Sequence, residues 1–121
     1  MRVVPIIQTQ TQQELTLTVV SLESYADACT VRFLAQIPTI AYTQFQLPEI
    51  VAVRDDRGGR YRTRSMGGGG GGRGERMLLR FKEMFFPELD PEATRVDLTV
   101  GVTLSDGRDI RWEVTIPIPL E

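Results

Sequence analysis

The segment 95–117, RVDLTVGVTLSDGRDIRWEVTIP, is the part of the sequence that decides the fold class. Apolar and polar residues alternate from Val96 to Leu104 and again from Ile110 to Ile118, which is the two-residue period of a strand with one buried face. The turn-forming residues 105–108, Ser-Asp-Gly-Arg, lie between the two runs. This pattern is typical of antiparallel sheets and predicts a C-terminal β-hairpin with Trp112 in the core.

Shorter alternating runs fill the rest of the chain. The run at residues 3–8 contains Pro5, which favours an edge position in the sheet. In the run at residues 15–22, the alternation changes phase near residues 19–20, which predicts a β-bulge. We expect 50–54 and 60–64 to form a second hairpin around the Asp/Gly-rich residues 55–59. The expected strands before the C-terminal hairpin are 3–8, 15–22, 29–36, 50–54, 60–64 and 76–85, the last with Met77, Leu79 and Phe81 inward.

The number and spacing of these runs predict an all-β fold. With 121 residues, the chain suits one domain, an antiparallel β-sandwich of seven to eight strands over residues 1–121. Asp90 and Pro91 are typical of a helix start and predict one short helical turn near 90–93. A helical turn, a long strand and a final hairpin resemble the end of bacterial immunoglobulin-like domains. This resemblance implies the immunoglobulin-like sandwich and assigns no functional residue.

Gly67–Gly72 is a run of six consecutive glycines, and Gly74 follows closely. Glycine loses more backbone entropy on folding than any other residue, so a regular structure there is costly. The sequence therefore predicts a mobile glycine-rich loop at about 65–75 between two strands.

The composition removes most catalytic and metal-binding chemistry. The chain has no His, a single Cys at position 29 and a single Lys at position 82, which leaves no imidazole base, disulfide or thiolate zinc site. We expect no enzymatic activity, no cofactor and no metal site. The close carboxylate pairs are typical of turns, although a carboxylate-based hydrolase or a Ca²⁺-dependent carbohydrate binder stays open as a weaker alternative. These pairs are Asp55–Asp56, Asp90–Glu92 and Asp106–Asp109.

Positive charge is concentrated in one part of a chain whose net charge is −2. Flexible Arg/Gly segments with an aromatic residue bind single-stranded nucleic acid, and the alternation would place Arg60, Arg62 and Arg64 in one row. Arginines on an edge strand also prevent edge-to-edge pairing, so a purely solvated face is the competing interpretation. The candidate binding surface in segment 54–76 comprises Arg57, Arg60, Tyr61, Arg62, Arg64, Arg73 and Arg76.

By elimination, the sequence favours a non-enzymatic binding or structural module whose partner is a protein. The alternative is a polyanion or single-stranded nucleic-acid binder that uses the Arg/Gly segment 54–76. No apolar run approaches the roughly 20 residues of a membrane span, and no signal peptide is evident. As it stands, the chain would be cytoplasmic, whereas a trimmed exported protein would look the same. The sequence leaves the oligomeric state open.

Overall fold

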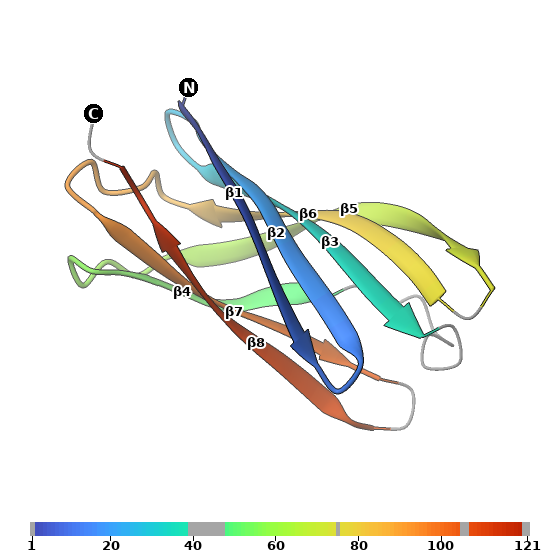
Figure 1. Ribbon diagram of the computed structural model, residues 1–121. Coiled ribbons are helices and arrows are strands. Elements are labelled where there is room, and N and C mark those ends of the chain that lie inside the picture. The colour runs from blue at the N-terminus through green and yellow to red at the C-terminus, as the bar shows by residue number, and fades with distance from the viewer. Residues whose placement is uncertain (1, 39–47, 75, 105–106, 120–121) are drawn as a thin grey trace.

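The computed structural model describes residues 2–38, 48–74, 76–104 and 107–119 and forms two antiparallel sheets (Figure 1). The five-stranded sheet contains, in spatial order, β1 (Arg2–Gln12), β2 (Leu15–Ser24), β3 (Cys29–Pro38), β6 (Arg76–Phe86) and β5 (Arg62–Arg73). The three-stranded sheet contains β4 (Glu49–Asp55), β7 (Arg95–Thr103) and β8 (Asp109–Pro117). The all-β fold with eight strands is therefore confirmed, and the described residues contain no helix.

At residues 90–93, the chain makes one hydrogen-bonded turn in place of a helix. The amide of Ala93 donates to the carbonyl oxygen of Asp90 at 3.0 Å, and the amide of Glu92 donates to Oδ1 of Asp90 at 2.8 Å. Asp90 therefore caps this turn as expected, but β7 starts at Arg95 and leaves no length for a further turn.

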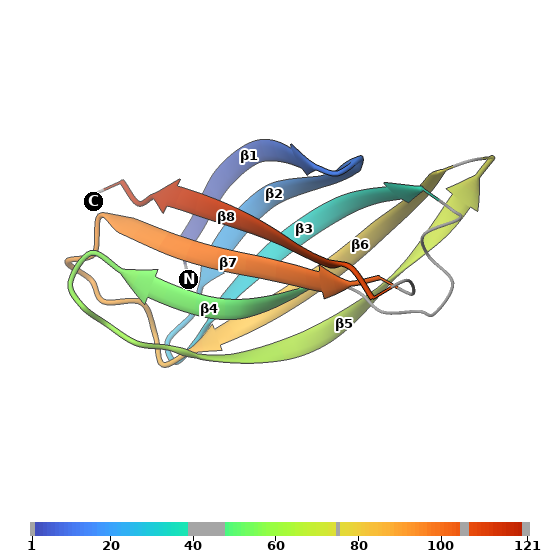
Figure 2. The same ribbon diagram turned by 90° about the horizontal axis from the view of Figure 1, so that it is seen from below.

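The two sheets face each other across one core, and Figure 2 shows them as two layers. The C-terminal hairpin is confirmed: Val100 of β7 lies opposite Trp112 of β8, and both side chains are fully buried. Residues 105–106 of the predicted turn lie outside the described residues. Within the core, the rings of Phe33 and Phe81 stack with centroids 4.9 Å apart, which fixes β3 against β6.

Three further details of the sequence prediction are confirmed. β1 is an edge strand, as Pro5 indicates, and the register of β2 against β3 shifts between Val19 and Ser21. Leu79 and Phe81 are buried on β6, with Met77 packed beside them. Alternation within a strand therefore identifies both its inward face and its irregularities.

Polar side chains connect the edges of the two sheets. The side-chain amides of Gln8 and Gln10 on β1 donate to the carbonyl oxygens of Thr115 and Glu113 on β8, at 2.9 and 2.7 Å. At the other side, Oε1 of the buried Glu83 accepts a hydrogen bond from the amide of Ile50 on β4 at 2.9 Å. Burial raises the pKa of Glu83. These contacts satisfy backbone groups on edge strands that no neighbouring strand reaches.

The predicted hairpin of 50–54 with 60–64 is wrong. β4 and β5 belong to different sheets, and one isolated backbone bridge joins Arg54 of β4 to Arg60, which precedes β5. The reason lies in the connection, where Oδ1 of Asp55 accepts hydrogen bonds from the amides of Arg57 and Gly59 at 2.8 and 2.7 Å. These bonds close a local turn, after which the chain crosses to the five-stranded sheet.

The predicted glycine-rich loop at 65–75 is also wrong. β5 runs through the glycines, and each residue of Gly67–Gly72 lies opposite a residue of β6; residue 75 lies outside the described part. A Cβ atom at Gly68 would collide with the carbonyl oxygen of Arg80, and one at Gly70 with that of Leu78. The strand therefore approaches β6 more closely than side chains allow, and pairing with β6 offsets the entropy that argued for a loop.

Candidate functional site

The outer face of the five-stranded sheet carries most of the positive charge of the strands. On β3 and β6, cationic residues alternate with buried ones, so that the sheet pleat places them all on the solvent side. Glu23 is the acidic side chain that the described strand residues contribute to this face. The cations, which together we call the basic face, are Arg32, Arg62, Arg64, Arg76, Arg80 and Lys82.

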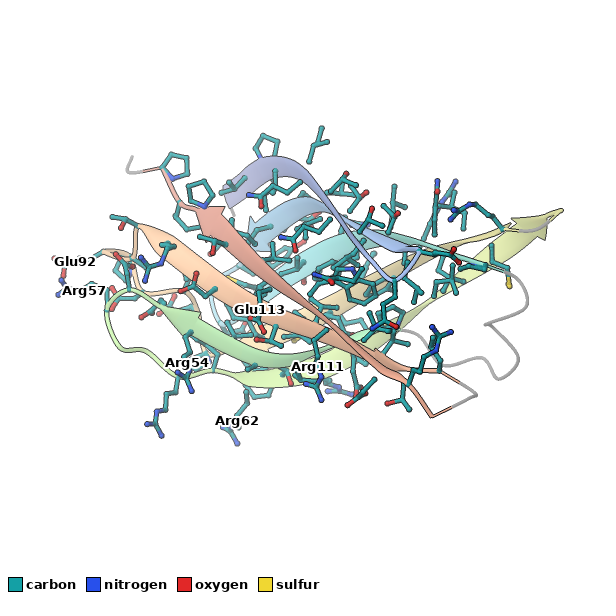
Figure 3. All side chains as sticks on the ribbon, turned by 60° about the horizontal axis from the view of Figure 1, so that its bottom comes forward. Arg54, Arg57, Arg62, Glu92, Arg111 and Glu113 are labelled. Carbon is teal, nitrogen blue, oxygen red and sulfur yellow. The ribbon has the colours of Figure 1, made fainter. Side chains whose placement is uncertain are left out.

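The outer face of the three-stranded sheet has a different charge pattern. Arg95 pairs with Asp97 at 3.1 Å, and Arg111 pairs with Asp109 at 3.4 Å. Figure 3 shows Arg111 and Glu113 along β8, where cations and carboxylates alternate. Two arginines of this second face are thus paired with its own carboxylates, and Arg54 of β4 is the one without an ion pair among the described residues, so most of the unpaired positive charge of the strands lies on the basic face.

A hollow of ≈ 560 Å³ lies within the basic face and opens to solvent. Its cations are Arg32 of β3 and the pair Arg80 and Lys82 of β6. Its apolar side chains are Val20, Leu34 and Met66, and the backbone of Gly67–Gly69 forms part of the lining. This volume lies within the range of small-ligand pockets, and the lining combines apolar and cationic groups as such pockets do.

The glycines of β5 make this hollow possible. A Cβ atom added at Gly69 would meet nothing within 4 Å, so that position leaves open space on the outer face. Met66 stands at the bulge in β5 between Ser65 and Gly67, and the hydroxyl of Thr30 donates to its sulfur at 3.8 Å. Since Thr30 is on β3, the side chain of Met66 lies across β6 and bounds the hollow.

The cations of the hollow differ in whether a carboxylate already neutralises them. Nε of Arg32 pairs with Oε1 of Glu23 at 2.6 Å, and this hydrogen bond lowers the pKa of Glu23. For Arg80 and Lys82, the described part of the chain offers no ion-pair partner within 4.0 Å. Both positive charges are therefore available to an anionic group that enters the hollow.

Some of the sequence-predicted binding residues belong to the basic face. Arg62 and Arg64 lie on β5 opposite Phe86 and Met84, and the guanidinium carbon of Arg62 lies 5.2 Å from the centre of the Phe86 ring. Figure 3 shows Arg62 pointing away from the sandwich. Arg76 begins β6 on the same face, and the backbone of Arg73 pairs with it.

The other predicted residues lie elsewhere. Arg57 pairs with Glu92 at 3.1 Å at the end of the sandwich, away from the basic face (Figure 3). The backbone of Arg60 pairs with that of Arg54 in the opposite sheet, so Arg60 does not belong to β5. The predicted row of three arginines is therefore reduced to Arg62 and Arg64. Tyr61 is not an open stacking surface, because its ring packs on Phe85 with centroids 5.1 Å apart and its hydroxyl donates to Asp55.

Sequence reasoning missed Arg32, Arg80 and, as a binding residue, Lys82. The local alternation already placed each of them on the outward side of its strand. What the sequence could not show is that β3 and β6 are neighbours, with Arg32 opposite Lys82 and Leu34 opposite Arg80. Strand pairing between distant segments is therefore what assembles the hollow.

Apart from Asp106, which lies outside the described residues, the carboxylates that suggested a hydrolase or a Ca²⁺ site have structural contacts. Burial raises the pKa of Asp55, but hydrogen bonds from Tyr61 and two backbone amides outweigh it and leave the pKa below its ordinary value. Hydrogen bonds from the hydroxyl and amide of Thr94 lower the pKa of Asp56 to about 2. Among the described residues, no three Cys, Asp or Glu side chains gather as a metal site would require. Cys29 is buried, and burial raises the pKa of its thiol.

In the described ranges, no helix has the length and apolar character to cross a membrane. No family model matches the sequence, and no curated protein matches it. Among solved structures, the chain is similar to one described as the crystal structure of the conserved domain protein from Bacillus anthracis, with a TM-score of 0.74 and 13% sequence identity. The match covers 98% of this chain and 49% of that one, so the chain spans about half the length of that protein. At this identity, the similarity shows a shared all-β fold.

Proposed function

We propose that this chain is a non-enzymatic β-sandwich module that binds an acidic segment of a protein partner through the basic face. The observation that carries the proposal is the charge difference between the two outer faces. One face pairs Arg95 and Arg111 with its own carboxylates, whereas the other carries six cations, three of which line the hollow, and has Glu23 as its acidic strand residue. Such a charge distribution accelerates and selects association with a partner of opposite charge.

A protein partner is favoured over single-stranded nucleic acid because of the aromatic residues. Proteins that bind single strands stack the bases on exposed aromatic rings. Among the described strand residues, Phe86 is the aromatic side chain of the basic face, and Arg62 covers its ring. The exposed Tyr25, which follows β2, lies at the carboxylate that the described strand residues contribute to this face, because its hydroxyl donates to Glu23 at 2.8 Å. Phe33 and Phe81 also line the hollow, but both rings are buried in the core, so its exposed surface offers aliphatic groups and cations, which suit apolar and acidic side chains.

The proposal includes an immunoglobulin-like kind of sandwich. The order β2-β3-β6-β5 opposite β4-β7-β8 supports it, because constant-type immunoglobulin domains arrange their seven strands in this order. β1 is then an additional strand beside β2. Domains with this architecture have many unrelated functions, so the architecture itself adds nothing to the choice of partner.

The test is the anisotropy of a fluorescein-labelled deca-glutamate peptide titrated with the protein. The triple variant Arg64→Gln, Arg80→Gln, Lys82→Gln is expected to bind the peptide at least about tenfold more weakly. Each lost charge contact weakens binding by part of this factor, and the three losses combine. Raising the salt concentration should weaken binding to the native protein.

The matched control removes three arginines from the opposite face, through Arg54→Gln, Arg95→Gln and Arg111→Gln. It should retain peptide binding. Equal losses in both triple variants would contradict the proposal, because net charge rather than the basic face would then determine binding. Tighter binding of a labelled oligothymidylate than of deca-glutamate would replace the protein partner with a nucleic acid.

A further inference from the structure

We infer that the hollow holds one apolar side chain of the partner segment, with acidic residues two positions away on either side of it. This inference rests on the proposed function and adds the sequence pattern that the basic face would select.

The apolar part of the pattern follows from the side chains inside the hollow. Val20, Leu34 and Met66 come from β2, β3 and β5, and each is only partly buried or exposed in the free protein. Met66 is 48% exposed, which is a large fraction for an apolar side chain held in place by a contact with Thr30. A partner side chain that covers these groups gains the free energy of removing their apolar surface from water.

The acidic part follows from the positions of the cations. Arg80 and Lys82 are two residues apart on one strand, and Arg32 lies opposite Lys82 on the next. In an extended peptide, side chains two positions apart point to the same side and are separated by roughly 7 Å. An extended segment with its apolar residue in the hollow therefore directs the acidic residues two positions away toward these cations.

The glycine strand makes the hollow testable without removing any charge. Gly69 and Gly71 both have open space where a side chain would begin, and Gly69 lines the hollow whereas Gly71 does not. Neither glycine has a positive φ, so side chains are sterically permitted at both. Gly69→Leu would fill the hollow, and Gly71→Leu is its matched control on the same strand.

The probes are two fluorescein-labelled nonapeptides, Ser-Ser-Glu-Ser-Leu-Ser-Glu-Ser-Ser and the same peptide with serine in place of leucine. The native protein is expected to bind the leucine peptide at least about tenfold more tightly, since a buried leucine side chain contributes this much or more. Gly69→Leu should reduce that ratio to about one, while Gly71→Leu should keep it. Thermal melting checks that each variant is folded. If Gly69→Leu does not fold, Gly69→Val fills the hollow with a smaller side chain.

The outcomes separate this inference from the proposed function. Equal binding of the two peptides, with loss of both in the Arg64, Arg80 and Lys82 triple variant, would overturn the inference and leave the basic face as the binding surface. The inference would also fail if Gly69→Leu and Gly69→Val kept the preference for leucine. If the triple variant bound every peptide as tightly as the native protein does, the proposed function would be overturned as well.

Discussion

Replacing Trp112 with alanine is expected to lower the free energy of unfolding by about 3–5 kcal/mol, the largest single effect in the sandwich. Trp112 is fully buried on β8 and lies opposite Val100 on β7, so truncation leaves a cavity between the two sheets. Thermal or urea unfolding measures the change, and a loss of this size should lower the melting temperature by more than about 10 °C.

The variant Trp112→Phe serves as the control for this prediction. Nε1 of Trp112 has no hydrogen-bond acceptor among the described residues, so the indole contributes mainly apolar contacts. Phenylalanine retains part of this surface and should cost clearly less than alanine. If Trp112→Ala melted at the native temperature, the register of the C-terminal hairpin would be incorrect, since that register is what places residue 112 inside.

Gly68→Ala is expected to destabilise the protein by about 1–3 kcal/mol, the cost of forcing an additional methyl group into a packed structure. At Gly68, a Cβ atom would collide with the carbonyl oxygen of Arg80 and with the backbone of Phe81. Both obstacles are main-chain atoms of β6 or adjoin them, so only a shift of β5 away from β6 relieves the collision.

The adjacent variant Gly69→Ala is the matched control, because the same methyl group there meets open space. It should be neutral or stabilising by up to about 1 kcal/mol, since alanine restricts the unfolded chain more than glycine does. If this segment were a loop, alanine at Gly68 and alanine at Gly69 would change the stability by similar amounts. Equal melting temperatures for Gly68→Ala and Gly69→Ala would therefore contradict the close pairing of β5 with β6.

The sequence predicted best those elements whose partners are near in the chain. The hairpin of β7 and β8 has its turn and both alternating runs within one short segment, and the bulge in β2 appears as a local change of phase. The partner of residues 62–64 was predicted wrongly because both β4 and β6 are plausible neighbours, and the choice depends on hydrogen bonds of Asp55 and Tyr61. Local periodicity carries no information on such a choice.

The glycine run shows a second limit of prediction from local propensity. Backbone entropy argued for a loop, but the contacts that overcome it come from β6, which is on the far side of the turn. The basic face has the same origin. Half of its cations, Arg62, Arg64 and Arg76, belonged to the predicted charged segment, whereas Arg32, Arg80 and Lys82 joined them only through the pairing of β3 with β6. The hollow could not be predicted, since it depends on the absence of side chains on a strand that the sequence did not indicate.

The most direct test of the basic face is to map the amide chemical shifts of ¹⁵N-labelled protein during titration with deca-glutamate. The largest changes should fall on β3, β6 and β5, around Arg32, Arg80, Lys82 and Gly69, where the cations surround the hollow. The amide chemical shifts of the outer-face residues of β7 and β8, among them Asp97 and Arg111, should hardly change, because the charges of these residues are already paired. Changes centred on β7 and β8, or on the Arg57–Glu92 pair at the end of the sandwich, would contradict the assignment of the basic face as the binding surface.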